Sequence, residues 1–131
     1  MRMAFELQMV GVAVLIGLVH LLCVAVIGDV QRGLKWSAGP RDARIELTGL
    51  GGRLERAWAN FCETFPLFVA AVVVTYLGGR IGVLTSIGAL LYVVGRVAYL
   101  PLYAFGVPWL RSVAWFVSLF GIIAILLALV V

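Results

Sequence analysis

The sequence predicts an all-α protein, a transmembrane four-helix bundle with up-down topology. Three observations support this fold class. The chain is 64% hydrophobic and only 12% charged, with a mean hydropathy of +1.15, whereas soluble domains are roughly half apolar and about a quarter charged. Four apolar runs are long enough to cross a bilayer. The connections between the later runs are too short to cross it again. We therefore expect residues 1–131 to form a single integral-membrane domain.

The first expected span covers residues 9–27 and is apolar except for His20. We interpret His20 as a hydrogen-bonded histidine of the bundle rather than a ligand. The run is too long for a typical signal peptide, and no clean cleavage site follows it. Three further spans are expected, over residues 53 or 56 to 77, 81–105, and 110 or 113 to 131.

The segment from residue 28 to about 55 is the only long polar stretch. Gly39-Pro40 indicates a turn, and we expect Gly49-Leu50-Gly51-Gly52 to interrupt the chain before the second span. Six of the ten Lys and Arg residues lie between residues 32 and 56. Arg111 lies between the third and fourth spans, and only Arg2 and Arg80 lie on the opposite side. The positive-inside rule then places the first and third loops in the cytoplasm and both termini outside.

Two composition features exclude other chemistries. The net charge of +4 reflects this loop bias and does not indicate nucleic-acid binding. Cys23 and Cys62 both fall within expected spans, and no second ligand lies at metal-binding spacing. We expect two buried free thiols and no metal site.

Polar residues enter the second and third spans on one face each. Arg53, Arg56, Asn60 and Glu63 are three, four and three residues apart, so a helix places them on one face. Arg96, Tyr99 and Tyr103 are three and four residues apart and share a face in the same way. In an up-down bundle both faces lie at the cytoplasmic end, together with Arg111 and Ser112 of the fourth span and with Asp29, Gln31 and Arg32 of the first.

Glu63 and Arg96 are expected at similar depth. Glu63 lies ~10 Å along its helix from Arg56, and Arg96 lies ~12 Å from Ala104. An unpaired charge at that depth costs ~2.5–3.5 kcal/mol. We therefore predict a Glu63–Arg96 ion pair, within one subunit or across an interface.

Each polar residue also has a plainer interpretation. The ion pair could be structural only, the tyrosines could belong to an interfacial aromatic belt, and Arg111 could be a topology anchor. Taken together, these residues predict an arginine-rich, tyrosine-lined pocket that suits a small ligand with carboxylates, because arginine binds carboxylates bidentately.

These motifs resemble those of the MAPEG family, the membrane-associated proteins in eicosanoid and glutathione metabolism. The resemblance lies in Arg56-Ala57-x-x-Asn60-x-x-Glu63-Thr64 followed closely by Pro66, in Gly95-Arg96-Val97-Ala98-Tyr99-x-x-x-Tyr103, and in Arg111-Ser112. It covers nearly the whole chain. The compact chain without a retention tail favours a bacterial member.

The resemblance implies a homotrimer in a membrane, with glutathione bound between neighbouring subunits near the cytoplasmic side. Asn60 and Glu63 would hold the peptide, Arg96 would pair with Glu63, and Arg111 and Ser112 would lie near the sulfur. The remaining implied contacts are Arg56, Tyr99, Tyr103, Gln31 and Arg32.

The resemblance thus predicts a glutathione-dependent transferase or peroxidase of the bacterial inner membrane, with its site facing the cytoplasm. Arg111 would stabilise the thiolate, since a nearby cation lowers a thiol pKa from ~8.5. A lipophilic small-molecule substrate would enter from the lipid.

The chain departs from the family pattern at Ala59, where several relatives have an arginine, and at Gln31, which replaces a cation. Tyr99 stands where a relative has a histidine. These departures leave open a non-catalytic trimeric scaffold or a lipid- or glutathione-binding protein. A four-span multidrug exporter is disfavoured because that class depends on a carboxylate within the first span, whereas Glu6 precedes the apolar run and Asp29 follows it.

Overall fold

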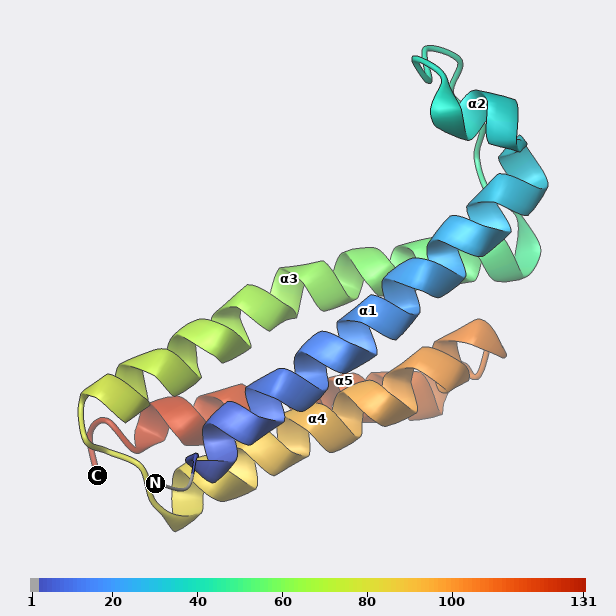
Figure 1. Cartoon of the computed structure of the whole chain (residues 1–131). Helices are drawn as coiled ribbons and strands as arrows, with labels where there is room; N and C mark the ends of the chain where they lie inside the picture. Colours follow the sequence, from blue (N-terminus) through green and yellow to red (C-terminus); the bar gives the residue numbers. More distant parts are fainter. Residues whose placement is uncertain (1–2) are drawn as a thin grey trace.

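The computed structural model describes residues 3–131, which form long helices running side by side (Figure 1). Arg2, which entered the topology argument, lies outside these residues. The elements are α1 (Phe5–Arg32), α2 (Leu34–Ala38), α3 (Gly49–Leu77), α4 (Val83–Ala104) and α5 (Pro108–Leu127). All but α2 are long and apolar enough to cross a membrane. The described residues contain no strand, so the predicted all-α fold with four spans is confirmed.

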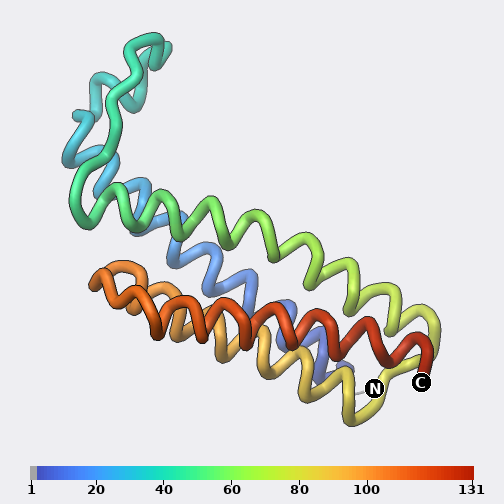
Figure 2. The backbone as a smooth tube through the Cα atoms, turned by 180° about the vertical axis from the view of Figure 1, so that it is seen from behind, coloured from blue at the N-terminus to red at the C-terminus, as the bar shows by residue number. Residues whose placement is uncertain are grey.

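The four spans alternate in direction, and both ends of the described chain lie at the same end of the bundle (Figure 2). The helix α1 packs against α3 and α4, while α5 packs against α4 and α3. The helices α1 and α5 therefore occupy opposite corners of the bundle.

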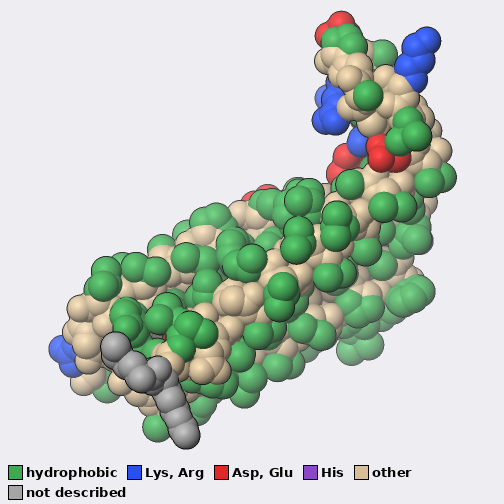
Figure 3. Space-filling model, in the orientation of Figure 1, with side chains coloured by type: hydrophobic (Ala, Val, Ile, Leu, Met, Phe, Trp, Pro, Cys, Tyr) green, Lys and Arg blue, Asp and Glu red, His purple; other side chains and the backbone are tan. Residues whose placement is uncertain are grey.

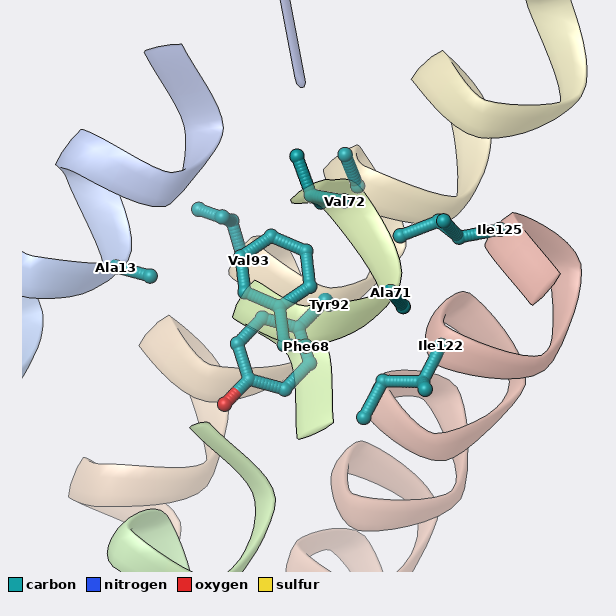
Figure 4. Close-up of a cluster of buried hydrophobic side chains, with 9 residues drawn as sticks. Ala13, Phe68, Ala71, Val72, Tyr92, Val93, Ile122 and Ile125 are labelled. Atoms are coloured by element: carbon teal, nitrogen blue, oxygen red, sulfur yellow. The ribbon is translucent and has the colours of Figure 1, made fainter. Parts of the chain in front are cut away.

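The buried core lies in the middle of the bundle and draws on all four spans (Figure 4). The rings of Phe68 and Tyr92 stack with centroids 4.0 Å apart, and both side chains are fully buried. Ala13 of α1 and Ile122 of α5 close the cluster on its two sides. The core thus fixes α3 against α4, the two helices that carry the predicted polar faces.

The helices α4 and α5 touch backbone to backbone at a pair of glycines. A Cβ atom added to Gly88 would lie 2.6 Å from the carbonyl oxygen of Gly121, and one added to Gly121 would lie 2.5 Å from that of Gly88. Small residues permit such close approach, which favours helix association in membranes. This glycine seam makes α4 and α5 a tightly joined hairpin.

Glu6 lies within the first turn of α1 and is 1% exposed. Its Oε1 accepts hydrogen bonds from Thr85 Oγ1 at 2.7 Å and Ser86 Oγ at 2.8 Å. Glu6 does precede the apolar run, as expected, but α1 begins before that run and includes Glu6. The hydroxyls and the positive N-terminal ends of α1 and α4 stabilise the carboxylate inside the bundle.

The sequence also misplaced the start of the second span. The glycine-rich stretch expected to interrupt the chain is the first turn of α3. Gly51 and Gly52 are buried, and added Cβ atoms would lie 2.9 Å from Gln31 Nε2 and 2.7 Å from the Leu47 carbonyl oxygen. These glycines therefore allow close packing rather than ending a helix.

Residues 33–48 form an arm that projects beyond the helical body (Figure 1). Its Trp36 ring lies under the guanidinium groups of Arg32 and Arg41, at 4.9 and 5.7 Å, and its Nε1 donates to the Ala43 carbonyl at 2.6 Å. Figure 3 shows hydrophobic side chains over most of the visible body and charged side chains gathered on the arm.

The two cysteines are free, as expected, but they are exposed on the helix surface. The expectation of buried thiols is wrong because Cys23 and Cys62 point away from the core, into apolar grooves beside α1 and α3.

Candidate functional site

A polar pocket of about 290 Å³ lies between α3 and the α4–α5 hairpin, toward the end where the arm projects. Five of the predicted site residues line it, together with two aromatic residues of α5. The lining residues are Asn60, Tyr99, Tyr103, Arg111, Ser112, Trp115 and Phe116. Three helices that are far apart in sequence thus bring the predicted motifs together.

Two arginines of α3 reach across to the C-terminal end of α4. Arg53 Nε donates to the Ala104 carbonyl oxygen at 2.8 Å. Arg56 Nε donates to the Tyr103 hydroxyl at 3.3 Å. A cation at a helix C-terminus complements the helix dipole, so these contacts fix the end of α4 beside α3. The role of Arg53 in ending α4 could not be read from the sequence.

Arg96 lies in the bundle interior and is 2% exposed. Its Nη1 donates to Asn60 Oδ1 at 2.8 Å, and Asn60 Nδ2 donates to Glu63 Oε2 at 3.4 Å. Within the chain, the expected direct Glu63–Arg96 ion pair is therefore replaced by an amide bridge. The reason is geometric: Glu63 faces outward and is exposed, whereas Arg96 points inward.

Aromatic rings surround the rest of the Arg96 guanidinium. Its carbon lies 5.6 Å from the Tyr92 ring centroid and 5.1 Å from that of Tyr99, distances at which a cation is attracted to an aromatic face. Among residues 3–131, nothing accepts a hydrogen bond from Arg96 Nε or Nη2, although both atoms are buried. The Tyr92 contact was not foreseen, although Tyr92 and Arg96 are one helical turn apart.

Arg111 lies at the start of α5 with its guanidinium carbon 4.5 Å from the Tyr103 ring centroid. Within residues 3–131 its side chain makes no hydrogen bond and no ion pair. The neighbouring Ser112 hydroxyl donates to the Pro108 carbonyl oxygen at 3.1 Å. Arg111 therefore presents a cation to the pocket, whereas the Ser112 proton is already engaged.

Gln31 and Arg32 are predicted contacts that the chain does not bring into the pocket. Gln31 exchanges two hydrogen bonds with the backbone of Thr48. Arg32 pairs with Glu55 at 2.8 Å and also donates to the Ile45 carbonyl oxygen. Both side chains hold the base of the arm, because α1 continues past residue 27 and carries them beyond the pocket.

His20 is hydrogen-bonded, as predicted, with its Nε2 3.1 Å from the Leu54 carbonyl oxygen. It also meets Trp58 edge-on, with ring centroids 5.5 Å apart. The lining role of Trp115 and Phe116 was missed, because apolar residues of a membrane span do not by themselves indicate a pocket.

The fold and the pocket define a class: an integral membrane protein of four spans with an arginine- and tyrosine-lined pocket at one end. Four arginines converge on this region, whereas Glu63 is its single carboxylate among the residues described above. The sequence profile of the MAPEG family matches residues 9–131, nearly the whole chain. The chain therefore belongs to the MAPEG family, and it is a multi-pass membrane protein of that glutathione and eicosanoid metabolism family. A search of curated proteins finds no match to this chain.

Proposed function

We propose that the protein is a glutathione-dependent membrane enzyme, a transferase or peroxidase that acts on lipophilic electrophiles. The observation that carries the proposal is the unpaired Arg111 cation in a pocket whose other members are hydrogen-bonding side chains and aromatic rings. A pocket with an unpaired cation favours the thiolate over the thiol. The thiolate is the nucleophile in both reactions.

Side chains that are hydrogen-bonded to lining residues of the pocket offer complementary partners for the rest of glutathione. Arg56 and Arg96 are cations for its two carboxylates, and Glu63 is a carboxylate for its ammonium group. Asn60 already joins Arg96 to Glu63 by hydrogen bonds, and so holds charges of both signs in fixed positions. Tyr99 forms part of the wall between them.

Tyr103 and Ser112 are the candidate neutral donors to the sulfur. The Tyr103 oxygen accepts a hydrogen bond from Arg56, which leaves its own proton free to be donated. The Ser112 hydroxyl must first leave the Pro108 carbonyl. We therefore assign Arg111 the charge stabilisation and give Tyr103 precedence over Ser112 as the donor.

The chemistry follows from the thiolate. In a transfer, the sulfur bonds to an electrophilic carbon of the lipophile and displaces a leaving group or opens a strained ring. In a peroxidase reaction, the sulfur attacks one oxygen of the hydroperoxide, the O–O bond breaks, and the products are a glutathione sulfenic acid and an alcohol. The thiol of a second glutathione then condenses with the sulfenic acid to give glutathione disulfide and water.

A homotrimer is part of the proposal. Glu63 is exposed on the surface of the single chain, within a helix that crosses the membrane. A carboxylate facing lipid at that depth is costly, so a second copy that covers this face would remove the cost. Gln31 and Arg32 would contribute to a glutathione site only from such a neighbour or after leaving the arm.

The positive-inside rule supports a cytoplasmic position for the pocket, because the arginine-rich arm lies at the same end of the bundle. We also propose that this membrane is a bacterial inner membrane.

Glutathione titration into the purified protein in detergent tests the proposal. We expect binding at millimolar glutathione with thiolate absorbance near the ultraviolet edge, and loss of that absorbance in Arg111→Ala. Arg80→Ala, which removes an exposed arginine at the other end of the bundle, should leave the signal unchanged. If wild-type protein binds no glutathione at these concentrations, the proposal is wrong.

A second candidate is a non-catalytic trimeric scaffold or a lipid- or glutathione-binding protein of the same fold. The engagement of Gln31 and Arg32 in the arm favours it, because two expected contacts are then missing from the pocket. Glutathione binding without a thiolate signal in wild-type protein would support this candidate.

A further inference from the structure

The arm is fastened to the ends of α1 and α3 at both of its own ends. Gln31 of α1 exchanges two hydrogen bonds with the backbone of Thr48. Arg32 pairs with Glu55 of α3 at 2.8 Å and donates to the Ile45 carbonyl oxygen at 2.7 Å. The direction in which the arm projects is therefore fixed by the two helices.

The arm is also ordered internally, around one tryptophan. The Trp36 ring lies against the guanidinium groups of Arg32 and Arg41, and its Nε1 donates to the Ala43 carbonyl oxygen. Arg41 donates from Nε and Nη2 to the Ser37 carbonyl oxygen, at 2.9 and 2.7 Å. The backbone of Arg41 has a φ of +59°, a conformation that is unfavourable for residues other than glycine and is often found at functional sites. The arm thus holds an exposed arginine in a strained position.

The surface of the arm is basic and partly apolar. Its exposed charged residues are Lys35, Arg41, Asp42, Arg44 and Glu46, so three basic side chains outnumber two acidic ones. Arg44 and Glu46 lie 3.9 Å apart. Within residues 3–131, Lys35 and Arg41 make no ion pair. Leu34, beside Lys35, is 71% exposed, so the arm presents free cations next to an apolar side chain.

The arm extends sideways rather than straight out from the bundle. Figure 1 and Figure 2 show it bent away from the direction of the helices, toward the side of α1 and α3 and away from the α4–α5 hairpin. Its base is near the end of the spans, because Arg53 of α3 contacts Ala104, the last residue of α4. The arm therefore lies over whatever surrounds α1 and α3 in the plane of the membrane, which is either lipid or a neighbouring copy.

Charge favours lipid over a neighbouring copy. A second copy presents the same arginine-rich end, so an arm resting on it would bring like charges together. Anionic headgroups attract each lysine or arginine held near the membrane surface. An exposed leucine beside a lysine also suits this surface, because the apolar side chain can enter the interface while the ammonium group stays in water.

We infer that the arm docks on the membrane surface and binds the headgroups of anionic phospholipids. Lys35 and Arg41 contact the headgroup phosphates, and Leu34 enters the interfacial region. The internal order around Trp36 keeps these side chains in place before lipid binds. This surface is separate from the polar pocket, and the inference does not depend on thiol chemistry.

Hydrogen–deuterium exchange of the full-length protein in lipid nanodiscs tests the inference. We compare phosphatidylcholine with an equal mixture of phosphatidylcholine and phosphatidylglycerol. In the mixture, the amides of residues 33–48 should exchange at least about fivefold more slowly, the factor that ~1 kcal/mol per basic residue provides. The difference should vanish at about 1 M salt, where the Debye length is ~3 Å. Residues 105–107, an uncharged turn at the same end, are the internal reference. Equal exchange of the arm in both lipids would overturn the inference.

Two charge variants should change the lipid effect in opposite directions. Lys35→Gln removes a cation, and we expect the slowing by phosphatidylglycerol to fall at least about twofold. Asp42→Asn removes an opposing carboxylate and should increase the slowing. Loosening of the arm would reduce protection in both variants, so a fall in both, or a change in neither, would contradict headgroup binding. Arg80→Gln, at the other end of the bundle, is the control and should leave the arm unaffected.

The same data distinguish lipid from a subunit contact. An arm resting on a neighbouring copy would be protected equally in the two lipids, which would overturn the inference in favour of an interface. No glutathione is present in these measurements. If the protein fails to bind glutathione but the arm responds to phosphatidylglycerol as expected, the proposed enzyme function fails and the lipid contact stands.

Discussion

Arg96 Nη1 donates a 2.8 Å hydrogen bond to Asn60 Oδ1, and this contact joins the two helices that carry the family's motifs. It is the single hydrogen bond that Arg96 makes with the described residues, since its other buried nitrogens have no partner. The Asn60 amide thus accepts one hydrogen bond from the buried Arg96 guanidinium, whose charge Glu63 was expected to neutralise.

Replacing Asn60 should therefore destabilise the bundle. Asn60→Leu removes the acceptor, and we expect a loss of about 1.5–3 kcal/mol, the range for hydrogen bonds to charged groups. Thermal unfolding in detergent, followed by circular dichroism, measures the loss. Asn60→Asp restores an acceptor at the same place and should recover most of the stability. Equal losses in the two variants would show that the contact with Arg96 is unimportant.

The glycine seam predicts a large effect from one methyl group. Gly121→Ala places a Cβ only 2.5 Å from the Gly88 carbonyl oxygen, so the two backbones must separate. Overpacking of this kind costs about 1–3 kcal/mol. Gly11→Ala is the control, because nothing lies within 4 Å of its added Cβ, and it should be neutral or stabilising. Unfolding temperatures of both variants check the prediction, which fails if Gly121→Ala is as stable as wild type.

Glu6 should contribute to stability without affecting glutathione binding. In Glu6→Leu the Thr85 and Ser86 hydroxyls lose their acceptor, and we expect a loss of about 1.5–3 kcal/mol. Glu6→Gln keeps one oxygen acceptor and should lose less. Glutathione affinity, measured by titration, should remain at the wild-type value because Glu6 lies at the opposite end of the bundle. A drop in affinity at unchanged stability would refute a purely structural role.

Glu63 should matter for assembly or for ligand binding. Glu63→Gln removes the carboxylate that is hydrogen-bonded to Asn60 of the polar pocket, and we expect either a smaller assembly by mass analysis in detergent or loss of glutathione binding. Glu46→Gln, on the exposed arm, is the matched control and should change neither. If Glu63→Gln also changes neither, Glu63 belongs neither to an interface nor to the site.

The sequence was sufficient for the fold because membrane helices must satisfy every backbone hydrogen bond within themselves. Apolar runs and turn residues then locate the spans. Helix ends were less predictable, because glycines that permit close packing resemble glycines that end helices. Gly51 and Gly52 show this, because a Cβ at these positions would collide with the Gln31 side chain and the Leu47 carbonyl oxygen, respectively.

The site was predictable where periodicity determines a face. Asn60, Tyr99, Tyr103, Arg111 and Ser112 do line one pocket. Periodicity does not tell how deeply a side chain points inward or which neighbour it meets. That limit accounts for the indirect link between Glu63 and Arg96, and for the position of Gln31 and Arg32 at the arm.

The uneven packing of the bundle has a mechanical consequence. The glycine seam joins α4 and α5 closely into one unit, and the core fixes α3 against it, but at the arm end of the bundle the polar pocket lies between α3 and this unit. Three polar contacts join α3 to α4 near the pocket: Arg53–Ala104, Arg56–Tyr103 and Asn60–Arg96. We expect the pocket to widen when the arm ends of α1 and α3 tilt away from the α4–α5 unit. This movement requires the three contacts to break. The rate of ligand exchange would then depend on how often these contacts break rather than on the width of the closed pocket.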